Sequence, residues 1–214
     1  MSNWIVMADG SEYHLTGIDA VHNDFDPHVL AHHLAQINRY TGATVRPYSV
    51  AEHSLLCADI AQAMNLPRVA QLACLVHDYH EAITGDCIAP VKWTVGHAWE
   101  HFEQPIARTL HRHLGLHSTF SAWRERIRGI DLMALATERR DLLPYSTKHN
   151  RPWPVIDTPG MTVHPFEGAR LNTMKREQMH WTEWRDALRE RFNQLAELSK
   201  QEHAQRINQC AQED

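Results

Sequence analysis

Apolar residues recur at three- and four-residue steps through most of this chain, which is the spacing of one face of an α-helix. The first such stretch runs from about residue 28 to Gly42, and its apolar positions are Val29, Leu30, Leu34, Ile37 and Tyr40. The same spacing predicts further helices over residues 49–64, 67–84, 97–114, 120–143 and 179–200. The sequence therefore predicts an all-α fold.

Local signals set several of the helix boundaries. Ser49 suits an N-cap and Glu52, three residues later, suits its reciprocal partner, an arrangement called a capping box. Pro67 suits the first turn of the next helix. Pro105 is expected to kink or split the helix over residues 97–114, because proline removes a backbone donor.

Three segments depart from helical spacing. Residues 4–15 are predicted to form a β-hairpin around Asp9-Gly10, a dipeptide suited to tight turns. The proline-rich residues 144–165 are expected to form an irregular loop, and the polar tail 201–214 to fray. At 214 residues the chain is long enough for one domain with a sizeable core, so we expect a single helical domain with a small N-terminal hairpin.

Charge and cysteine usage limit the partners and the compartment. With 26 acidic and 21 basic residues the net charge is −5, which argues against a protein that coats nucleic-acid backbones. No apolar run approaches the length of a membrane span, and the first residues lack the pattern of a secretory signal. None of the four cysteines forms a CxxC pair; they are Cys57, Cys74, Cys87 and Cys210. We expect reduced cysteines and a cytoplasmic location.

The residues that carry the chemistry are His53, His77, Asp78 and Asp131. Each falls in a predicted helix beside apolar neighbours, where an aspartate is costly unless it is paired or binds a metal. Two imidazoles and two carboxylates suit a first-row divalent ion better than Ca²⁺. Taken singly, however, His53 is more often a hydrogen-bonded core histidine, and Asp131 could pair with Arg128. Spacing alone leaves both interpretations open.

Residues 28–142 resemble the HD-domain 5′-deoxynucleotidases of bacteria and their bacteriophage-encoded relatives. The matching words are Ile37–Tyr40, Tyr48–Ser54, His77–Ala82, Thr84–Asp86, Pro90–Lys92 and Ile130–Leu132. The combination of His-Asp-x-x-Glu with Thr-Gly-Asp is specific within the HD superfamily. The resemblance implies an HD-domain helical bundle, with residues 145–214 as a helical extension, and a metal-dependent phosphohydrolase acting in a bacterial cell or a phage-infected host.

The resemblance also implies a role for each matching residue. His53, His77, Asp78 and Asp131 would bind one divalent ion, which could be cobalt, manganese, zinc, nickel, iron or magnesium. The implied catalytic residues are Glu81, which positions or deprotonates a water, and Asp86, which contacts the sugar or assists the leaving group. The implied phosphate ligand is Arg39, with Lys92 a weaker candidate for the same work.

Plainer alternatives stand beside these roles. Glu81 could be a solvated helix residue, Asp86 a turn residue, and Arg39 a cation at the C-terminus of a helix. The deoxynucleotidases carry a tryptophan after the arginine, which helps reject a ribose 2′-hydroxyl, whereas this chain has Tyr40 as the candidate substrate-binding residue. Base and sugar preference are therefore not predicted. His80 is expected at the surface.

The reaction expected first is release of phosphate from a nucleoside 5′-monophosphate, with a deoxynucleotide favoured. A triphosphohydrolase acting on deoxynucleoside triphosphates would use the same ligands. Alarmone hydrolysis is less favoured, because those enzymes prefer Glu-Asp at the position where this chain has Glu81-Ala82. The alternative from another class is a non-catalytic nucleotide-binding regulator. By analogy with HD nucleotidases, we expect a homo-oligomer.

Overall fold

The fold is a helical bundle with a small two-stranded hairpin, as the sequence predicted. The computed structural model describes residues 3–213, and it describes no side chain for residue 206 or for residues 210–213, so Cys210 lies outside the described side chains. Strand β1 (Trp4–Val6) pairs antiparallel with β2 (Glu12–His14), with Ile5 opposite Tyr13. A short 3₁₀ turn over Ile18–His22 follows the hairpin.

The rest of the described chain is mainly helical. The helices are α1 (Pro27–Leu34), α2 (Val50–Ala63), α3 (Arg68–Val76), α4 (Glu81–Thr84), α5 (Ala89–Val95), α6 (His97–His113), α7 (His117–Ala122), α8 (Arg124–Leu142), α9 (Pro154–Asp157), α10 (Met174–Gln178) and α11 (Trp181–Glu213). A 3₁₀ turn over Tyr40–Gly42 lies between α1 and α2.

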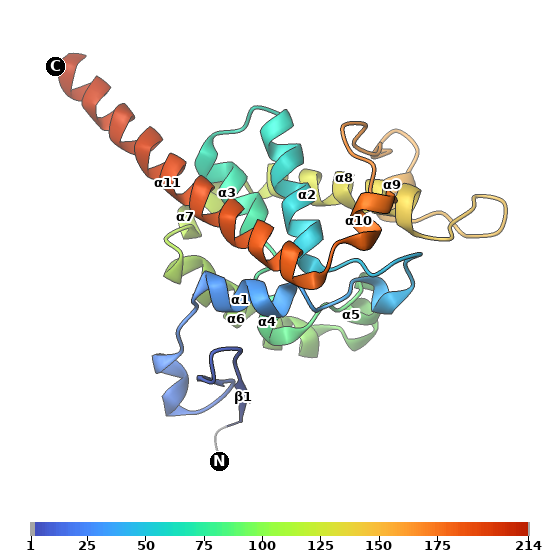
Figure 1. The fold of residues 1–214 in the computed structure, drawn as a ribbon, viewed down its shortest axis with the longest axis horizontal. Coiled ribbons are helices and arrows are strands. Elements are labelled where there is room, and N and C mark those ends of the chain that lie inside the picture. Colours follow the sequence, from blue (N-terminus) through green and yellow to red (C-terminus); the bar gives the residue numbers. More distant parts are fainter. Residues whose placement is uncertain (1–2, 214) are drawn as a thin grey trace.

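Helices α2 and α3 form the centre of the bundle. The long helix α11 packs along α1, α2 and α3, and its C-terminal half projects beyond the body of the molecule (Figure 1). Helix α8 packs against α2 and α3 and closes a second core cluster with buried residues such as Leu56, Ile60 and Ile130. This packing brings residues of α2, the end of α3 and α8 close together at one site.

Several helix boundaries differ from the sequence prediction. Helix α1 ends at Leu34 instead of continuing to Gly42, because Arg39 N donates to Tyr48 O and Val50 N donates to Ile37 O, which pairs this segment with the entry to α2. Helix α3 ends at Val76, so the His77-Asp78 pair lies in the turn before α4 and not within a helix.

The remaining differences concern breaks and lengths. Residues 117–142 form two helices separated at Trp123, and the short helix α5 was not predicted. Helix α6 runs unbroken through Pro105, so the proline does not split it. Helix α11 continues past residue 200 to Glu213, although a frayed tail was expected.

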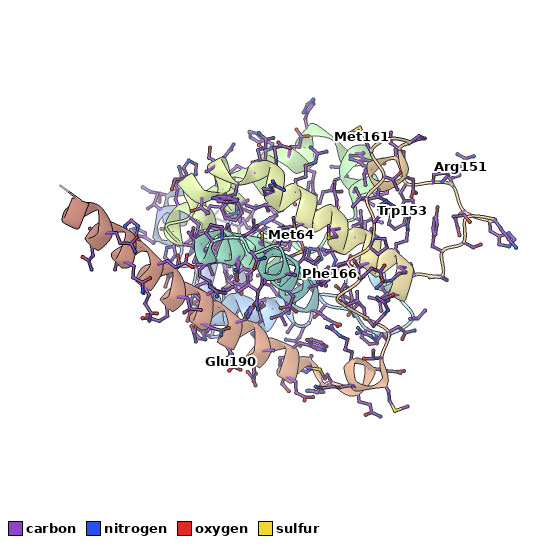
Figure 2. The ribbon with its side chains drawn as sticks, turned by 90° about the horizontal axis from the view of Figure 1, so that it is seen from above. Met64, Arg151, Trp153, Met161, Phe166 and Glu190 are labelled. Carbon is purple, nitrogen blue, oxygen red and sulfur yellow. The ribbon has the colours of Figure 1, made fainter. Side chains whose placement is uncertain are left out.

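The loop over residues 144–165 is irregular, as predicted, apart from the short helix α9. It extends at the end of the molecule away from the C-terminus, with Arg151 on its outer part and Trp153 nearer the helices (Figure 2). Arg139 anchors it by donating to both carboxylate oxygens of Asp157, at 2.5 and 2.7 Å. The same guanidinium lies 5.2 Å from the ring centre of Trp153.

The start of α2 is held by a buried ion-pair network. Ser49 Oγ accepts from Glu52 N at 3.2 Å, so Ser49 is the predicted N-cap. The Glu52 side chain does not complete the capping box. Instead it accepts from Arg46 at 2.5 and 2.8 Å and from Arg176 at 2.7 Å, at a position where Glu52 is 1% exposed. Because Arg46 also donates to Leu171 O, the network joins α2 to the segment before α10.

Removing this carboxylate should destabilise the fold strongly. In Glu52→Ala the buried guanidinium of Arg46 keeps only backbone acceptors, and breaking a buried pair in this way typically costs about 3–5 kcal/mol. We expect a loss of this size in the free energy of unfolding, measured by urea denaturation. Glu197→Ala, an exposed position on α11, is the control and should change little. A loss below 1 kcal/mol in Glu52→Ala would show that the network contributes no more than a surface pair.

His111 on α6 makes stability depend on pH. Its ring stacks on Phe120 with centroids 3.5 Å apart. Burial, together with the charges of His80 and His77, lowers the pKa of His111 to about 4. The unfolded chain binds this proton near pH 6.5, whereas the folded protein does so only near pH 4. Stability that is present above pH 6.5 is therefore lost as the pH falls through this window.

We expect this loss to be on the order of 2 kcal/mol after allowing for the partial exposure of His111. Urea midpoints at pH 7.5 and pH 4.5 measure it. His111→Gln removes the titrating group and should show a shallower fall than the wild type. His101→Gln, at an exposed position on the same helix, should keep the wild-type fall. Equal falls in wild type and His111→Gln would contradict the assignment.

Candidate metal centre

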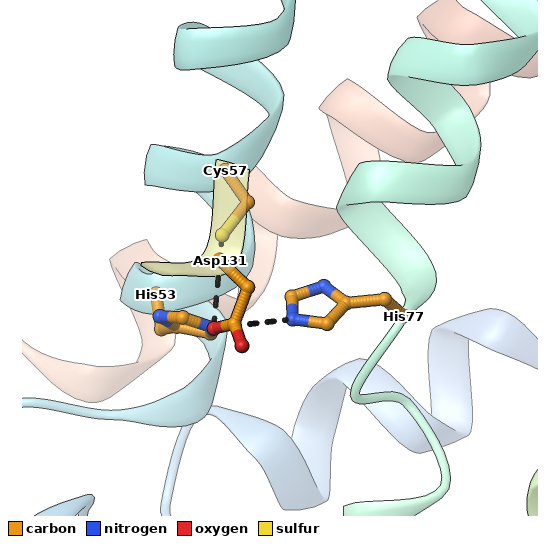
Figure 3. Close-up of side chains that lie close together, drawn as sticks. All are labelled: His53, Cys57, His77 and Asp131. Carbon is orange, nitrogen blue, oxygen red and sulfur yellow. Dashed lines mark hydrogen bonds and ion pairs between the residues drawn. The ribbon is translucent and has the colours of Figure 1, made fainter. Parts of the chain in front are cut away.

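Four predicted ligands converge between α2, α3 and α8. His53 lies on α2, His77 and Asp78 follow α3, and Asp131 lies on α8. Asp78 Oδ2 lies 3.3 Å from the Nε2 atoms of both histidines. Asp131 Oδ1 lies 3.4 Å from His53 Nε2 and 3.8 Å from His77 Nε2, and the two Nε2 atoms are 3.3 Å apart. Figure 3 shows His53, His77 and Asp131 around this point.

These spacings fit a bound divalent ion. Ligand atoms at about 2.1 Å from a metal are roughly 3.4 Å apart when the geometry is tetrahedral. The donor separations of 3.3–3.8 Å bracket this value. Two imidazole nitrogens and two carboxylate oxygens are a donor set that first-row divalent ions accept. The pairing of Asp131 with Arg128, which the sequence left open, is not found among the described residues.

The outer nitrogens of both histidines are held by hydrogen bonds. His53 Nδ1 lies 2.6 Å from Glu138 Oε1, and His77 Nδ1 lies 2.8 Å from the backbone oxygen of Cys74. Because a carbonyl or carboxylate oxygen accepts, each Nδ1 carries a proton, so Nε2 is the nitrogen of each ring whose lone pair an ion would use. Such contacts orient metal-binding histidines and fix their tautomer. Both rings therefore present the correct atom to the ion.

Glu138, which the sequence analysis missed, is the centre of this support. It is completely buried on α8 and also accepts from Tyr48 Oη at 2.8 Å and from Tyr40 Oη. Burial alone would raise the pKa of Glu138, but the charges of Arg39 and His53 outweigh it and hold the pKa at about 2. The signal was available, because Glu138 lies seven residues after Asp131 and so occupies the same helix face.

Arg39 lies beside the predicted ligands. Its Nη1 is 3.4 Å from Asp78 Oδ2 and 4.0 Å from Asp86 Oδ1, and its Nη2 is 3.5 Å from Glu138 Oε2. Arg39 is 9% exposed and has extended backbone geometry, so it is not the helix C-terminal cation of the plainer interpretation. Asp86 is brought to the same place, with its side chain 8% exposed.

The turn after Arg39 has unusual backbone geometry. Tyr40 and Thr41 both have positive φ, at 57° and 51°, and Gly42 follows at 80°. A residue other than glycine in this region costs roughly 1–2 kcal/mol. The hydrogen bond from Tyr40 Oη to the buried Glu138 holds the turn in place. Tyr40 is thereby placed next to Arg39, with its hydroxyl engaged by protein.

Glu81 and Lys92 form a second charged pair, close enough to Asp78 for its charge to act on Glu81. Glu81 begins α4 and is 3% exposed, so it is not a solvated helix residue. Its Oε1 is 3.9 Å from Lys92 Nζ, which donates to Glu103 at 2.6 Å. Burial and the nearby charge of Asp78 raise the pKa of Glu81 well above its usual range. His80, expected at the surface, is buried, with Nε2 3.4 Å from Glu103.

The charge balance favours ionised ligands at the centre. Burial would raise the pKa of Asp78, but the charges of His77, His53 and Arg39 outweigh it and hold the pKa well below its usual range. Asp131 behaves in the same way, because both histidines hydrogen-bond to its carboxylate and lower its pKa. Both aspartates are therefore carboxylates at neutral pH, which is the form that binds a cation.

Comparison with known proteins identifies the family. The sequence pattern of the HD domain matches residues 31–130, a span that holds His53 and the His77-Asp78 pair and ends one residue before Asp131. The chain belongs to the HD-domain family. HD-domain proteins are in general metal-dependent phosphohydrolases, and the clustered histidines and aspartates of this HD domain form a possible metal site.

Two curated relatives support this membership. The chain is 31% identical over 149 residues to an uncharacterized protein of Rhodobacter capsulatus, covering 67% of this chain and 74% of the relative. It is 30% identical over 186 residues to the uncharacterized protein YfdR of Escherichia coli K12, covering 85% of this chain and 88% of the relative. Within residues 3–213, no helix is long and apolar enough to cross a membrane.

Proposed function

We propose that this HD-domain protein releases phosphate from nucleoside 5′-monophosphates, with deoxynucleotides as the favoured class. The observation that carries the proposal is the Arg39 guanidinium 3.4 Å from Asp78, within one connected group that also holds His53, His77 and Asp131. A cation site for one phosphoryl oxygen and an arginine for another are what phosphate ester hydrolysis requires. The nucleotide class rests on the sequence resemblance.

The ion would be held by His53, His77, Asp78 and Asp131. When bound, it would supply Lewis acidity, which lowers the pKa of water and polarises a phosphoryl oxygen. Arg39 would neutralise the non-bridging oxygens of the phosphate through its planar fork. In the structure this fork is shared among Asp78, Asp86 and Glu138 at 3.4–4.0 Å, so a phosphate would compete with carboxylates that already orient it.

Glu81 and Asp86 would handle the protons. Glu81 Oε2 is buried and has no hydrogen-bond partner among the described residues, which leaves it available to a water that attacks phosphorus. The raised pKa of Glu81 makes its carboxylate a stronger base than that of an ordinary glutamate, which suits a group that accepts a proton from water. Asp86 Oδ1 lies 4.0 Å from Arg39 Nη1, and its carboxyl group would contact the sugar or protonate the leaving 5′-oxygen. Lys92 would reinforce the positive charge next to Glu81.

Glu81→Gln should therefore lower turnover without removing the ion. General base catalysis typically contributes about 10²–10⁴-fold, and we expect a fall in kcat within this range. Metal content by elemental analysis should stay at the wild-type level, because Glu81 is not among the four ligands. Glu100→Gln, at an exposed position on α6, is the control for the substitution itself. A kcat within a few-fold of wild type would remove Glu81 from the mechanism.

A substrate panel tests the proposed function. Ribo- and deoxynucleoside mono- and triphosphates are incubated with protein loaded with Mn²⁺, Co²⁺, Zn²⁺ or Mg²⁺, and phosphate and triphosphate are resolved as products. We expect phosphate from monophosphates. Triphosphate release would replace the proposal with the triphosphohydrolase reaction. An absence of turnover with every metal would reject hydrolysis of these nucleotides and favour the nucleotide-binding regulator.

A further inference from the structure

Cys57 lies against the candidate metal centre, and no proposed role yet includes it. Its Sγ is 3.6 Å from His53 Nε2, and the side chain is completely buried. The ligand atoms of His53, Cys57, His77 and Asp131 all lie within 4.8 Å of one another. Figure 3 shows the sulfur pointing toward His53 and Asp131. The thiol therefore belongs to the cluster of candidate ligand atoms and does more than fill space in the neighbouring core.

Helix geometry explains this placement. Cys57 lies four residues after His53 on α2, so the two side chains occupy the same face of the helix, one turn apart. That face is turned toward α3 and α8, and it contributes Cys57 to the core cluster that also contains Cys74 of α3 and Ile130 of α8. Cys74, in the same cluster, is not among the grouped ligand atoms. Of the two buried cysteines, only Cys57 places its sulfur among the candidate ligand atoms.

The sulfur is at the distance expected of a ligand. Metal–sulfur and metal–nitrogen bonds of about 2.3 and 2.1 Å, at the roughly 90–120° angles of a five-coordinate site, place the two donor atoms roughly 3.1–3.8 Å apart. The separation of Cys57 Sγ and His53 Nε2 is 3.6 Å. Without a metal, the same distance suits a weak hydrogen bond between the thiol and Nε2. The two arrangements exclude each other, because an Nε2 that shares a proton with the thiol has no lone pair free for the ion.

We propose that Cys57 is a further metal ligand, and that it gives this HD domain a preference for thiophilic ions such as Zn²⁺ and Co²⁺ over Mn²⁺ and Mg²⁺. The inference rests on the metal centre of the proposed function. With an ion bound, His53 Nε2 and the Cys57 sulfur would both hold it, and the thiol proton would pass to solvent. A thiolate is a soft ligand, whereas the other four donors are imidazole and carboxylate groups that suit harder ions as well.

Cobalt spectroscopy tests the assignment directly. Chelator-treated protein is titrated with Co²⁺, and the visible d–d bands report that the site is filled. A near-ultraviolet thiolate-to-cobalt charge-transfer band reports the sulfur ligand. We expect both in the wild type. Cys57→Ser should keep the visible bands and lose the charge-transfer band, while Cys74→Ser, the matched buried control, should keep both.

The outcomes separate this inference from the proposed function. Visible bands without a charge-transfer band in the wild type would overturn the role of Cys57 and leave the four-ligand centre standing. No cobalt binding at all would overturn the metal centre itself. Because the decisive comparison is made within the wild-type spectrum, the result does not depend on whether a variant folds.

Competition between ions gives a second readout. Cys57→Ser should weaken Zn²⁺ binding by roughly tenfold or more, since even outer partners of metal ligands typically contribute that much. The affinity for Mn²⁺, measured in the same competition assay, should stay within a few-fold of wild type. Equal losses for both ions would indicate general damage to the site and would contradict the thiophilic preference.

Discussion

Asp78→Ala is expected to abolish phosphate release. Asp78 Oδ2 lies 3.3 Å from both histidine Nε2 atoms, and it also accepts from Arg39. Losing this carboxylate removes a metal ligand and frees the arginine from its position. A bound ion stabilises a phosphoryl transition state by several kcal/mol, so we expect turnover to fall on the order of 10³-fold or more. Phosphate release from the best monophosphate of the substrate panel measures the change.

Asp59→Asn is the control for this variant. Asp59 is exposed on α2, two residues from Cys57, and pairs with Arg191 at 3.4 Å. Removing the Asp59 charge should leave turnover near the wild-type value, because an exposed ion pair contributes little to stability. Circular dichroism should show that Asp78→Ala remains folded. Turnover in a folded Asp78→Ala protein at wild-type level would contradict the assigned ligand set.

Glu138→Ala should reduce both stability and metal affinity. The substitution leaves His53 Nδ1 and the hydroxyls of Tyr48 and Tyr40 without their acceptor and removes one of the carboxylates around buried Arg39. Uncompensated buried polar groups of this kind cost about 3–5 kcal/mol. Because His53 loses the contact that fixes its tautomer, metal affinity should fall about 10–100-fold. Urea denaturation and metal titration measure the two effects separately.

Glu138→Gln separates the effect of the hydrogen bond to His53 from the effect of the negative charge. Its amide oxygen can still accept from His53 Nδ1, so metal affinity should recover in part, whereas the lost charge should still cost stability. Glu125→Ala, exposed on the same helix, should match wild type in both assays. If Glu138→Ala bound metal with unchanged affinity, the role of Glu138 in orienting His53 would be wrong.

The sequence predicted the helical fold because apolar spacing is a local signal. It failed where long-range contacts decide the backbone. Residues 35–42 have helical spacing, yet Arg39 lies in extended backbone because this segment hydrogen-bonds to residues 48 and 50. In the same way, His77 and Asp78 follow a helix pattern but lie in a turn after Val76. That turn is what brings Asp78 next to His53.

The same distinction between local and long-range signals applies to the candidate site. Its predicted residues came from motif words, and the structure places Arg39 and Asp86 beside the four candidate ligands and Glu81 beside Lys92. Glu138 and Cys57 were missed because neither belongs to a motif word. Their roles follow from helix periodicity, seven residues after Asp131 and four after His53, and become evident only when α2 and α8 are packed together. Substrate identity stays a prediction.

A metal titration of chelator-treated wild-type protein is the most direct test of the central claim, that His53, His77, Asp78 and Asp131 form one divalent metal centre. Calorimetry with Co²⁺ or Zn²⁺ should give one tightly bound ion per chain, and the same titration of Asp78→Ala and His53→Ala should show that binding lost or greatly weakened. No tight binding in the wild type, or an unchanged stoichiometry and affinity in both variants, would contradict the account.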